Sequence, residues 1–324
     1  MTKTRSPKAT RLGRITEYLV EMFPPVSHLI LGASIFCVNY FALQAIAGIS
    51  PLVYSWRAVA GALSVVLFLL LMRVYDELKD VEADLAYGSS GDEKYVNRPI
   101  VAGRITVADL SILRWTVTGL LLVLNVPLGW PWPGLAFAFL FLFAWLSYKW
   151  FFWPAVSRHL LLAFATHNPI SLALFGYIFA VFVGDFGDRA GPGLLLLPLA
   201  LTTWLPVVAW EISRKVRLPE DETEYPTYSK VLGWRLATVI PIGLVTIAAA
   251  SLLFVARAAA VGPVFPCILV LAALLAIGAC VRHLIAPTAR SARLQTPMEA
   301  YLLISKLGFT LALAIERGIE LTPA

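Results

Sequence analysis

The chain has 324 residues, of which 59% are hydrophobic and 14% are charged. An ordinary soluble domain is roughly 45–50% apolar and about 25% charged, so this composition excludes that class and indicates an integral membrane protein. The net charge of +6 does not point to nucleic acid, because basic residues gather at one face of a membrane protein for topological reasons alone.

Nine apolar runs are each close to the roughly 20 residues that cross about 30 Å of hydrocarbon as a helix. They lie at residues 26–48, 53–74, 111–130, 133–153, 160–183, 193–212, 236–256, 262–281 and 299–316. The segment before the first run is polar and basic and shows no cleavage pattern, so we expect residues 1–24 to remain as a basic N-terminus. The sequence therefore predicts one all-α transmembrane domain of about nine helices over residues 1–324.

The distribution of basic residues predicts the orientation of these helices. With nine spans, the N-terminus shares a side with the loops after spans 2, 4, 6 and 8. That side carries 22 of the 26 Lys and Arg residues, with Lys306 assigned to it near the last span. Because cytoplasmic loops carry an excess of Lys and Arg, we expect the N-terminus and these loops to be cytoplasmic, in the cell membrane if the source is bacterial.

The acidic residues gather in the same loops. Eight carboxylates lie between Asp76 and Asp109 and five between Glu211 and Glu224, together 13 of the 20 in the chain. Asp and Glu contribute little to membrane orientation, so topology does not explain this clustering.

The first acidic segment follows span 2 and places Asp76, Asp80 and Asp84 at intervals of four residues. On a helix this spacing stacks the three carboxylates on one face, where they repel one another unless a cation lies against them. Mg²⁺ prefers oxygen ligands and is commonly held by one or two carboxylates together with phosphate oxygens. The alternative is a solvated helix end in which Arg73 and Lys79 form salt bridges with these acids.

The second acidic segment follows span 6, where Glu211 precedes Arg214 and Lys215. An acid at the end of an apolar span is costly unless it is paired or binds a ligand, which favours a functional role for Glu211. Residues 220–224 are better explained as a solvated loop.

The first segment continues into Asn97-Arg98-Pro99-Ile-Val-Ala-Gly103-Arg104-Ile-Thr106, and here the sequence resembles the UbiA superfamily of intramembrane prenyltransferases. That superfamily has a first motif similar to N-D-x-x-D-x-x-x-D followed by N-R-P-L-x-x-G-R-I-S. In this chain Asp76 and Glu77 replace the first Asn and Asp. The superfamily's second motif, D-x-x-x-D, corresponds to Glu211-x-x-x-Lys215, in which an ammonium group replaces one carboxylate.

The resemblance implies a helical bundle around a central cavity, capped on the cytoplasmic side by the loops at residues 75–110 and 213–235. It also implies a set of site residues. Those implied to bind Mg²⁺ are Asp76, Glu77, Asp80, Asp84 and Glu211, with Asp76, Asp80, Asp84, Glu211 and Lys215 as catalytic residues. Those implied to contact a diphosphate are Arg98, Lys149, Arg158, Arg214 and Lys215.

Three further residues are weaker candidates for the cavity or an acceptor site. Tyr148 lies beside Lys149 after span 4, although residues at this depth also serve as interfacial anchors. His167 and Asn168 precede a proline inside span 5, a pattern that favours a kink facing a cavity.

The implied reaction is Mg²⁺-dependent transfer of a prenyl group from a prenyl diphosphate to a lipophilic acceptor, expected to be aromatic, within the membrane, with release of pyrophosphate. A UbiA-type terpene cyclase, which ionises the same substrate without an acceptor, is the first alternative. A non-catalytic transporter is the second, but such proteins use midplane charges in repeated halves, and the acids here cluster at one face.

Overall fold

The computed structural model describes residues 10–89, 93–187, 193–223 and 225–322. The predicted N-terminal segment and the two predicted loops are therefore described except for residues 1–9, 90–92 and 224. Within the described ranges the chain is almost entirely helical, which confirms the predicted all-α class.

Eight helical stretches of the described chain are long and apolar enough to cross a membrane. They are α2 (Pro25–Ile46), α3 (Trp56–Ser89), α5 with a short 3-10 turn (Val107–Leu128), α8 and α9 together (Leu160–Phe186), a 3-10 turn with α10 (Gly193–Ser213), α12 (Trp234–Ala258), α13 (Val264–Ile285) and the final helix (Gln295–Arg317). Helix α6 (Trp132–Tyr148) is the ninth apolar helix and is shorter, at 17 residues. The nine predicted runs thus correspond to helices of the structure.

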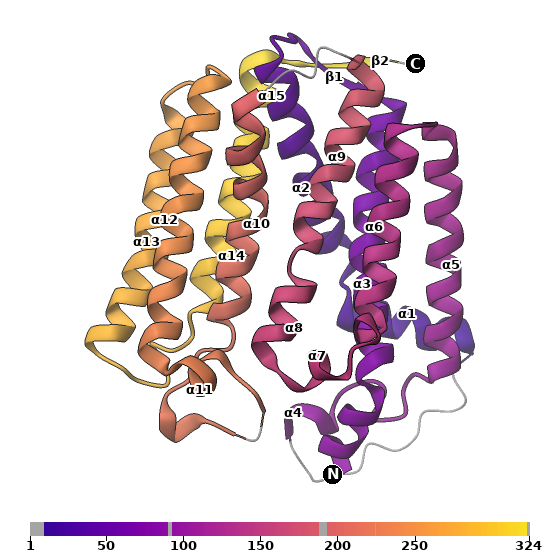
Figure 1. Cartoon of the computed structure of the whole chain (residues 1–324), viewed down its shortest axis with the longest axis vertical. Coiled ribbons are helices and arrows are strands. Elements are labelled where there is room, and N and C mark those ends of the chain that lie inside the picture. The colour runs from indigo at the N-terminus through magenta and orange to yellow at the C-terminus, as the bar shows by residue number, and fades with distance from the viewer. Residues whose placement is uncertain (1–9, 90–92, 188–192, 224, 323–324) are drawn as a thin grey trace.

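The helices run along the long axis of the molecule, and the short elements lie at its two ends (Figure 1). At one end lie α1 (Arg11–Met22), α4 (Glu93–Val96), α7 (Pro154–Arg158) and α11 (Tyr228–Leu232). At the other end β1 (Leu52–Ser55) pairs in parallel with β2 (Ile319–Thr322), which joins the start of α3 to the C-terminal segment. The acidic segments after the second and sixth membrane helices therefore share one end of the bundle.

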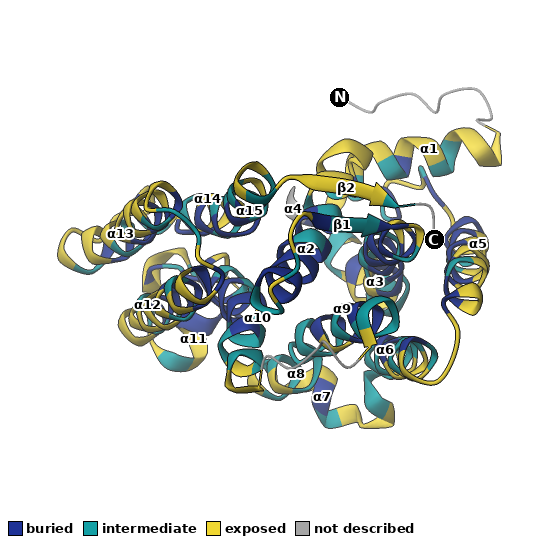
Figure 2. Cartoon of the chain, turned by 90° about the horizontal axis from the view of Figure 1, so that it is seen from above, coloured by how far each residue is buried: buried dark blue, intermediate teal, exposed yellow. Residues whose placement is uncertain are grey.

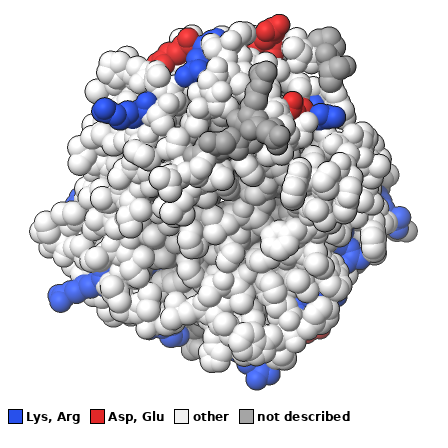
Figure 3. All heavy atoms as spheres, turned by 45° about the horizontal axis from the view of Figure 1, so that its top comes forward, with Lys and Arg blue, Asp and Glu red and all other residues white. Residues whose placement is uncertain are grey.

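Charge is sparse at the end that carries β1 and β2. A view with this end brought forward shows a mainly uncharged surface with few Lys, Arg, Asp or Glu side chains (Figure 3). One buried cluster lies here, in which Asp185 accepts a hydrogen bond from Ser55 Oγ at 2.8 Å and its carboxylate lies 3.6 Å from Arg57. The sorting of charge between the two ends agrees with the sequence, and the assignment of one end to the cytoplasm stays a prediction.

Close contact between α2 and α3 depends on two glycines. A Cβ atom at Gly32 would lie 3.0 Å from the Cα of Val66, and one at Gly61 would lie 2.5 Å from the ring of Phe36. Small residues at helix interfaces let two backbones approach closely. Van der Waals packing of this kind stabilises helix association in a membrane, where lipid is as apolar as the side chains. Seen along the bundle, buried residues line the contacts between helices and exposed residues face outward (Figure 2).

Helix α3 is longer than the membrane requires. Its 34 residues extend about 51 Å at about 1.5 Å per residue, well beyond the roughly 30 Å of hydrocarbon. The helix therefore carries the first acidic segment out of the bundle without interruption. Residues 75–89, part of a predicted loop, are helical, as the spacing of the three aspartates requires.

The N-terminal segment contains a helix that the pattern of apolar runs does not predict. Helix α1 is amphipathic, with Leu12 and Val20 exposed, and is too short to cross a bilayer. Arg14 binds both carboxylate oxygens of Asp109 at 2.8 and 2.9 Å, and Asp109 also forms a capping box with Thr106 at the start of α5. Helix α1 is thus held against the bundle beside the end of the first acidic segment.

Lys306 does not lie at the membrane face, so its assignment to the cytoplasmic basic residues was wrong. The final helix begins at Gln295, four residues earlier than predicted, and passes through a π-helical turn at Ile304–Gly308. This places Lys306 about 16 Å along the helix. Its side chain is 2% exposed and its ammonium group donates to the carbonyl of Thr202. Pro206 lacks the N–H that would otherwise bond this carbonyl within α10.

Candidate functional site

The three aspartates of α3 differ in their surroundings. Asp76 is exposed and lies 2.6 Å from Lys79 Nζ, while Asp84 is buried and forms an ion pair with Arg98. Arg98 also lies over the ring of Tyr95, at 4.8 Å. The predicted diphosphate contact Arg98 is therefore already paired with a predicted metal ligand.

Asp80 lies between these two pairs and has no ion pair or hydrogen bond of its own among the described residues. Its charged neighbours are Lys79, Asp76, Asp84 and Arg98, two of which are also acids. The side chain is partly buried. A partly buried carboxylate beside two other carboxylates is unfavourable unless a cation joins it, so Asp80 is the acid of this row best placed to bind one.

Glu77 is not part of the row. It is 2% exposed and forms an ion pair with Arg73, one helical turn earlier. Both charges also act on the buried Tyr18 of α1, so Glu77 faces the N-terminal helix. Asp76 and Asp84 also act electrostatically on Glu77, so this predicted metal ligand lies near the row although its own ion-pair partner is Arg73.

In the second segment the carboxylate of Glu211 is shared by two cations. Arg214 Nε lies 2.6 Å from Oε2, and Lys215 Nζ lies 2.9 Å from Oε1. Lys215 also lies 5.6 Å from the ring centre of Tyr228. Because one acid faces two bases, the end of α10 carries a net positive charge. This end of α10 is therefore suited to binding an anion. Glu211 holds the side chains of Arg214 and Lys215 in place.

Two tyrosines lie within electrostatic range of one another, one from each acidic segment. Burial and the nearby phenol of Tyr225 raise the pKa of Tyr95 to about 12, and Tyr95 also lies within electrostatic range of Asp84 and Arg98. Tyr225 in turn interacts electrostatically with Arg214 and Tyr228. The anionic end of α3 and the cationic end of α10 therefore lie at the same end of the bundle, with these tyrosines between them in electrostatic terms.

A cavity of about 120 Å³ opens beside Asp76. Its wall includes Tyr75, Ser147, Tyr148 and His167, so two of the three weaker candidates line it. Tyr148 stacks on Tyr75 with ring centres 4.7 Å apart. The ring nitrogens of His167 lie 2.9 Å from the carbonyl of Ala163 and 3.2 Å from that of Ser147, which fixes the imidazole against the wall.

The other candidates lie outside this cavity. Asn168 marks the expected interruption between α8 (Leu160–His167) and α9 (Ile170–Phe186), but its side chain accepts a hydrogen bond from Trp204 at 3.0 Å. Lys149 lies 4.5 Å over the ring of Tyr148, and Arg158 is exposed on α7 without an ion pair among the described residues. Of these three, only Lys149 lies beside the cavity.

Two solved structures resemble the chain over most of its length. A UbiA homolog from Aeropyrum pernix K1 superposes with a TM-score of 0.60 at 16% sequence identity, covering 87% of this chain and 97% of that one. A structure reported for digeranylgeranylglyceryl phosphate synthase superposes with a TM-score of 0.56 at 18% identity, covering 93% and 98%. The chain has the UbiA fold. No protein-family model matches the chain, and a search of curated protein sequences returns no match.

Because the resemblance to the UbiA superfamily implies Mg²⁺, we ask which side chains of this site could hold the ion. Among the described residues no three His, Cys, Asp or Glu side chains converge into a preformed metal cluster. Mg²⁺ commonly takes only one or two carboxylates and completes its shell with water and substrate phosphate. Asp76 and Asp80 lie one turn apart and fit this pattern, because Asp76 remains 54% exposed beside Lys79 and Asp80 has no ion pair among the described residues. Glu77 is buried against Arg73, and Glu211 is shared by two basic side chains.

Tyr95, Tyr225 and Trp150 are site residues that the sequence reasoning did not identify. The first two lie within electrostatic range of one another, and Lys79 lies 4.6 Å over the ring of Trp150. For the two tyrosines, the available signal was their position within polar loops; Trp150 lies in an aromatic run and carried no such signal.

Proposed function

We propose that this protein transfers a prenyl group from a prenyl diphosphate to a lipophilic acceptor within the membrane, with release of pyrophosphate. The observation that supports this proposal best is the Asp80 carboxylate on the anionic end of α3, which has no ion pair among the described residues, at the same end of the bundle as the cationic end of α10. One side is suited to a divalent cation and the other to phosphate oxygens. The UbiA fold of the chain agrees with this arrangement.

In this proposal Asp76 and Asp80 would hold Mg²⁺, which when bound offsets the charge of the diphosphate leaving group. Arg214 and Lys215 donate hydrogen bonds to the diphosphate oxygens, and Glu211 keeps the two cations in position. As the bond between the prenyl carbon and the diphosphate oxygen breaks, a new bond forms to the acceptor. The acceptor loses a proton and pyrophosphate leaves.

The cavity beside Asp76 would exclude water from the reacting carbon. Its wall contains the stacked rings of Tyr75 and Tyr148, whose faces favour positive charge. Phenol rings stabilise a developing carbocation without reacting as water would. We propose an aromatic acceptor on the same grounds, because a flat apolar ring matches this wall.

The proposal is tested with the purified full-length protein, a set of prenyl diphosphates of increasing chain length, and a lipophilic phenol as acceptor. Pyrophosphate release that requires both Mg²⁺ and acceptor, together with a prenylated product in the mass spectrum, is the expected result. If a cyclic hydrocarbon forms in the absence of an acceptor, the protein is a cyclase and the proposal of prenyl transfer is wrong. Absence of pyrophosphate release with every substrate, in protein shown to be folded, would refute the proposal.

A further inference from the structure

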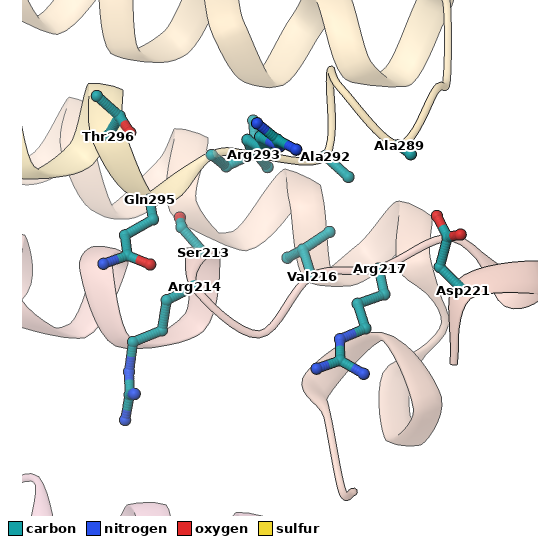
Figure 4. Close-up of a pocket in the computed structure, with 11 residues that line it drawn as sticks. Ser213, Arg214, Val216, Arg217, Asp221, Ala289, Ala292, Arg293, Gln295 and Thr296 are labelled. Carbon is teal, nitrogen blue, oxygen red and sulfur yellow. The ribbon is translucent and has the colours of Figure 1, made fainter. Parts of the chain in front are cut away.

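A second cavity, of about 370 Å³, lies at the end of α10 on the side of α13 and α14 (Figure 4). One wall is formed by residues 213–221 and the other by residues 289–296, the connection between α13 (Val264–Ile285) and α14 (Gln295–Leu303). No residue of the first acidic segment lines it. It is therefore distinct from the cavity beside Asp76.

The cavity contains a cation without a partner. Among its three arginines, Arg214 is paired with Glu211, and Arg217 donates to Thr223 at 3.0 Å. The side chains of both point away from the α13–α14 connection in Figure 4. Arg293, on the opposite wall, has no ion pair or side-chain hydrogen bond among the described residues. The one acid of the lining, Asp221, is exposed and lies near Ala289, away from the first turn of α14.

A buried hydroxyl also lacks a partner here. Ser213 is 1% exposed, and its Oγ has no hydrogen-bond partner in the described chain. Figure 4 shows this side chain directed toward the first turn of α14, where Gln295 and Thr296 begin the helix. Buried polar groups are nearly always satisfied, so an orphan that lines a cavity indicates a missing partner.

The first turn of α14 supplies further donors. This helix has nine residues, and its N-cap, Leu294, provides no side-chain cap. The backbone N–H groups of Gln295 and Thr296 are therefore not satisfied within the helix, and the helix dipole adds positive potential at this end. Backbone donors, a hydroxyl and a guanidinium together form the set of groups that binds phosphate oxygens.

We propose that this cavity binds the phosphate group of an anionic ligand, contacted by Arg293, by the Ser213 hydroxyl and by the start of α14. The phosphate belongs either to the headgroup of a membrane phospholipid or to a free phosphate ion. Both present the same oxygens, and the volume of about 370 Å³ accommodates either. The proposal does not rest on prenyl transfer, because it uses none of the acids of α3, and the one residue that lines this cavity and also belongs to the proposed diphosphate site, Arg214, points away from the α13–α14 connection.

The test measures binding to the full-length protein in two arms. In one, native mass spectrometry counts phosphatidylglycerol retained by delipidated protein, with phosphatidylcholine as the neutral comparison. In the other, equilibrium dialysis follows labelled inorganic phosphate. The variants are Arg293→Gln and Ser213→Ala. The matched control is Arg290→Gln, an exposed arginine three residues earlier on the same connection that does not line the cavity.

We expect one saturable site that Arg293→Gln weakens about tenfold or more, since charge-assisted hydrogen bonds to phosphate are the strong ones. Ser213→Ala should weaken it less, and Arg290→Gln should leave it unchanged. Saturation by phosphatidylglycerol alone assigns the site to lipid, and saturation by inorganic phosphate assigns it to the free ion. Saturation by neither ligand, or equal losses in Arg293→Gln and Arg290→Gln, would overturn the proposal whatever the outcome for pyrophosphate release.

Discussion

Replacing Asp80 by asparagine separates a role in binding a cation from a role in stability. The change removes one negative charge at nearly constant shape, and Asp80 has no basic partner among the described residues that would be left unpaired. A unit charge about 4 Å from another contributes about 4 kcal/mol at an effective dielectric constant near 20. At about 1.4 kcal/mol per factor of ten, loss of this interaction with bound Mg²⁺ in the transition state lowers turnover about 10³-fold.

The same change should not destabilise the fold. Asp80 is surrounded by Asp76 and Asp84 as well as by Lys79 and Arg98, so its neutralisation also removes repulsion between acids. We therefore expect an unchanged or slightly higher melting temperature together with the loss of turnover. The concentration of Mg²⁺ needed for half-maximal activity should rise.

The assay is the initial rate of pyrophosphate release across a Mg²⁺ titration, with the melting temperature measured on the same samples. The control is Glu82→Gln, which removes the same charge from an exposed position two residues along the helix. Turnover in Asp80→Asn within about threefold of the parent protein would refute a role for Asp80 in binding the cation. An equal loss in Glu82→Gln would show that only the overall negative charge of this helix end matters.

Two further predictions concern polar groups that the structure buries. Arg98→Ala should destabilise the protein by about 3 kcal/mol in chemical unfolding, because it leaves the carboxylate of Asp84, 4% exposed, without its cation; a loss below about 1 kcal/mol would mean that solvent screens the pair. Lys306→Met should cost about 1–3 kcal/mol by leaving the carbonyl of Thr202 unsatisfied, and adding Pro206→Ala should recover part of this by restoring an N–H in α10. Additive effects in this double-mutant cycle would contradict the pairing.

The membrane helices were predictable because length and apolarity alone specify them. A run of about 20 apolar residues has few alternatives to a spanning helix. Within the described residues, eight of the nine runs correspond to a helix long enough to span, and the remaining run corresponds to the shorter apolar helix α6. Boundaries were less accurate where polar residues lie inside a helix. The last helix begins before the apolar run does, and the position of Lys306 within it depends on a carbonyl 104 residues away that a proline leaves free.

The candidate site was predictable in its spacing and in its local ion pairs, which include those of Arg73 and Lys79, but not in its long-range pair. Intervals of four residues placed the three aspartates on one helix face, as the continuous α3 shows. The pairings of Glu77 with Arg73 and of Glu211 with Lys215 are also four residues apart, so the sequence contained the signal that these two acids have local partners. The pair between Asp84 and Arg98 joins residues 14 positions apart across a loop, a separation that gives no local sequence signal for the contact.

The pairings suggest a physical reason for the lysine at position 215. Two facing carboxylates at the end of α10 would need a metal ion to bind a diphosphate, whereas Glu211 with Arg214 and Lys215 presents net positive charge directly. On α3 the acids exceed their basic partners and Asp80 has no ion pair within the described part of the chain, so the requirement for a cation falls on that side alone. If this division holds, restoring a carboxylate with Lys215→Asp should weaken diphosphate binding at low Mg²⁺ and recover it as Mg²⁺ rises, because a second ion would then replace the ammonium group.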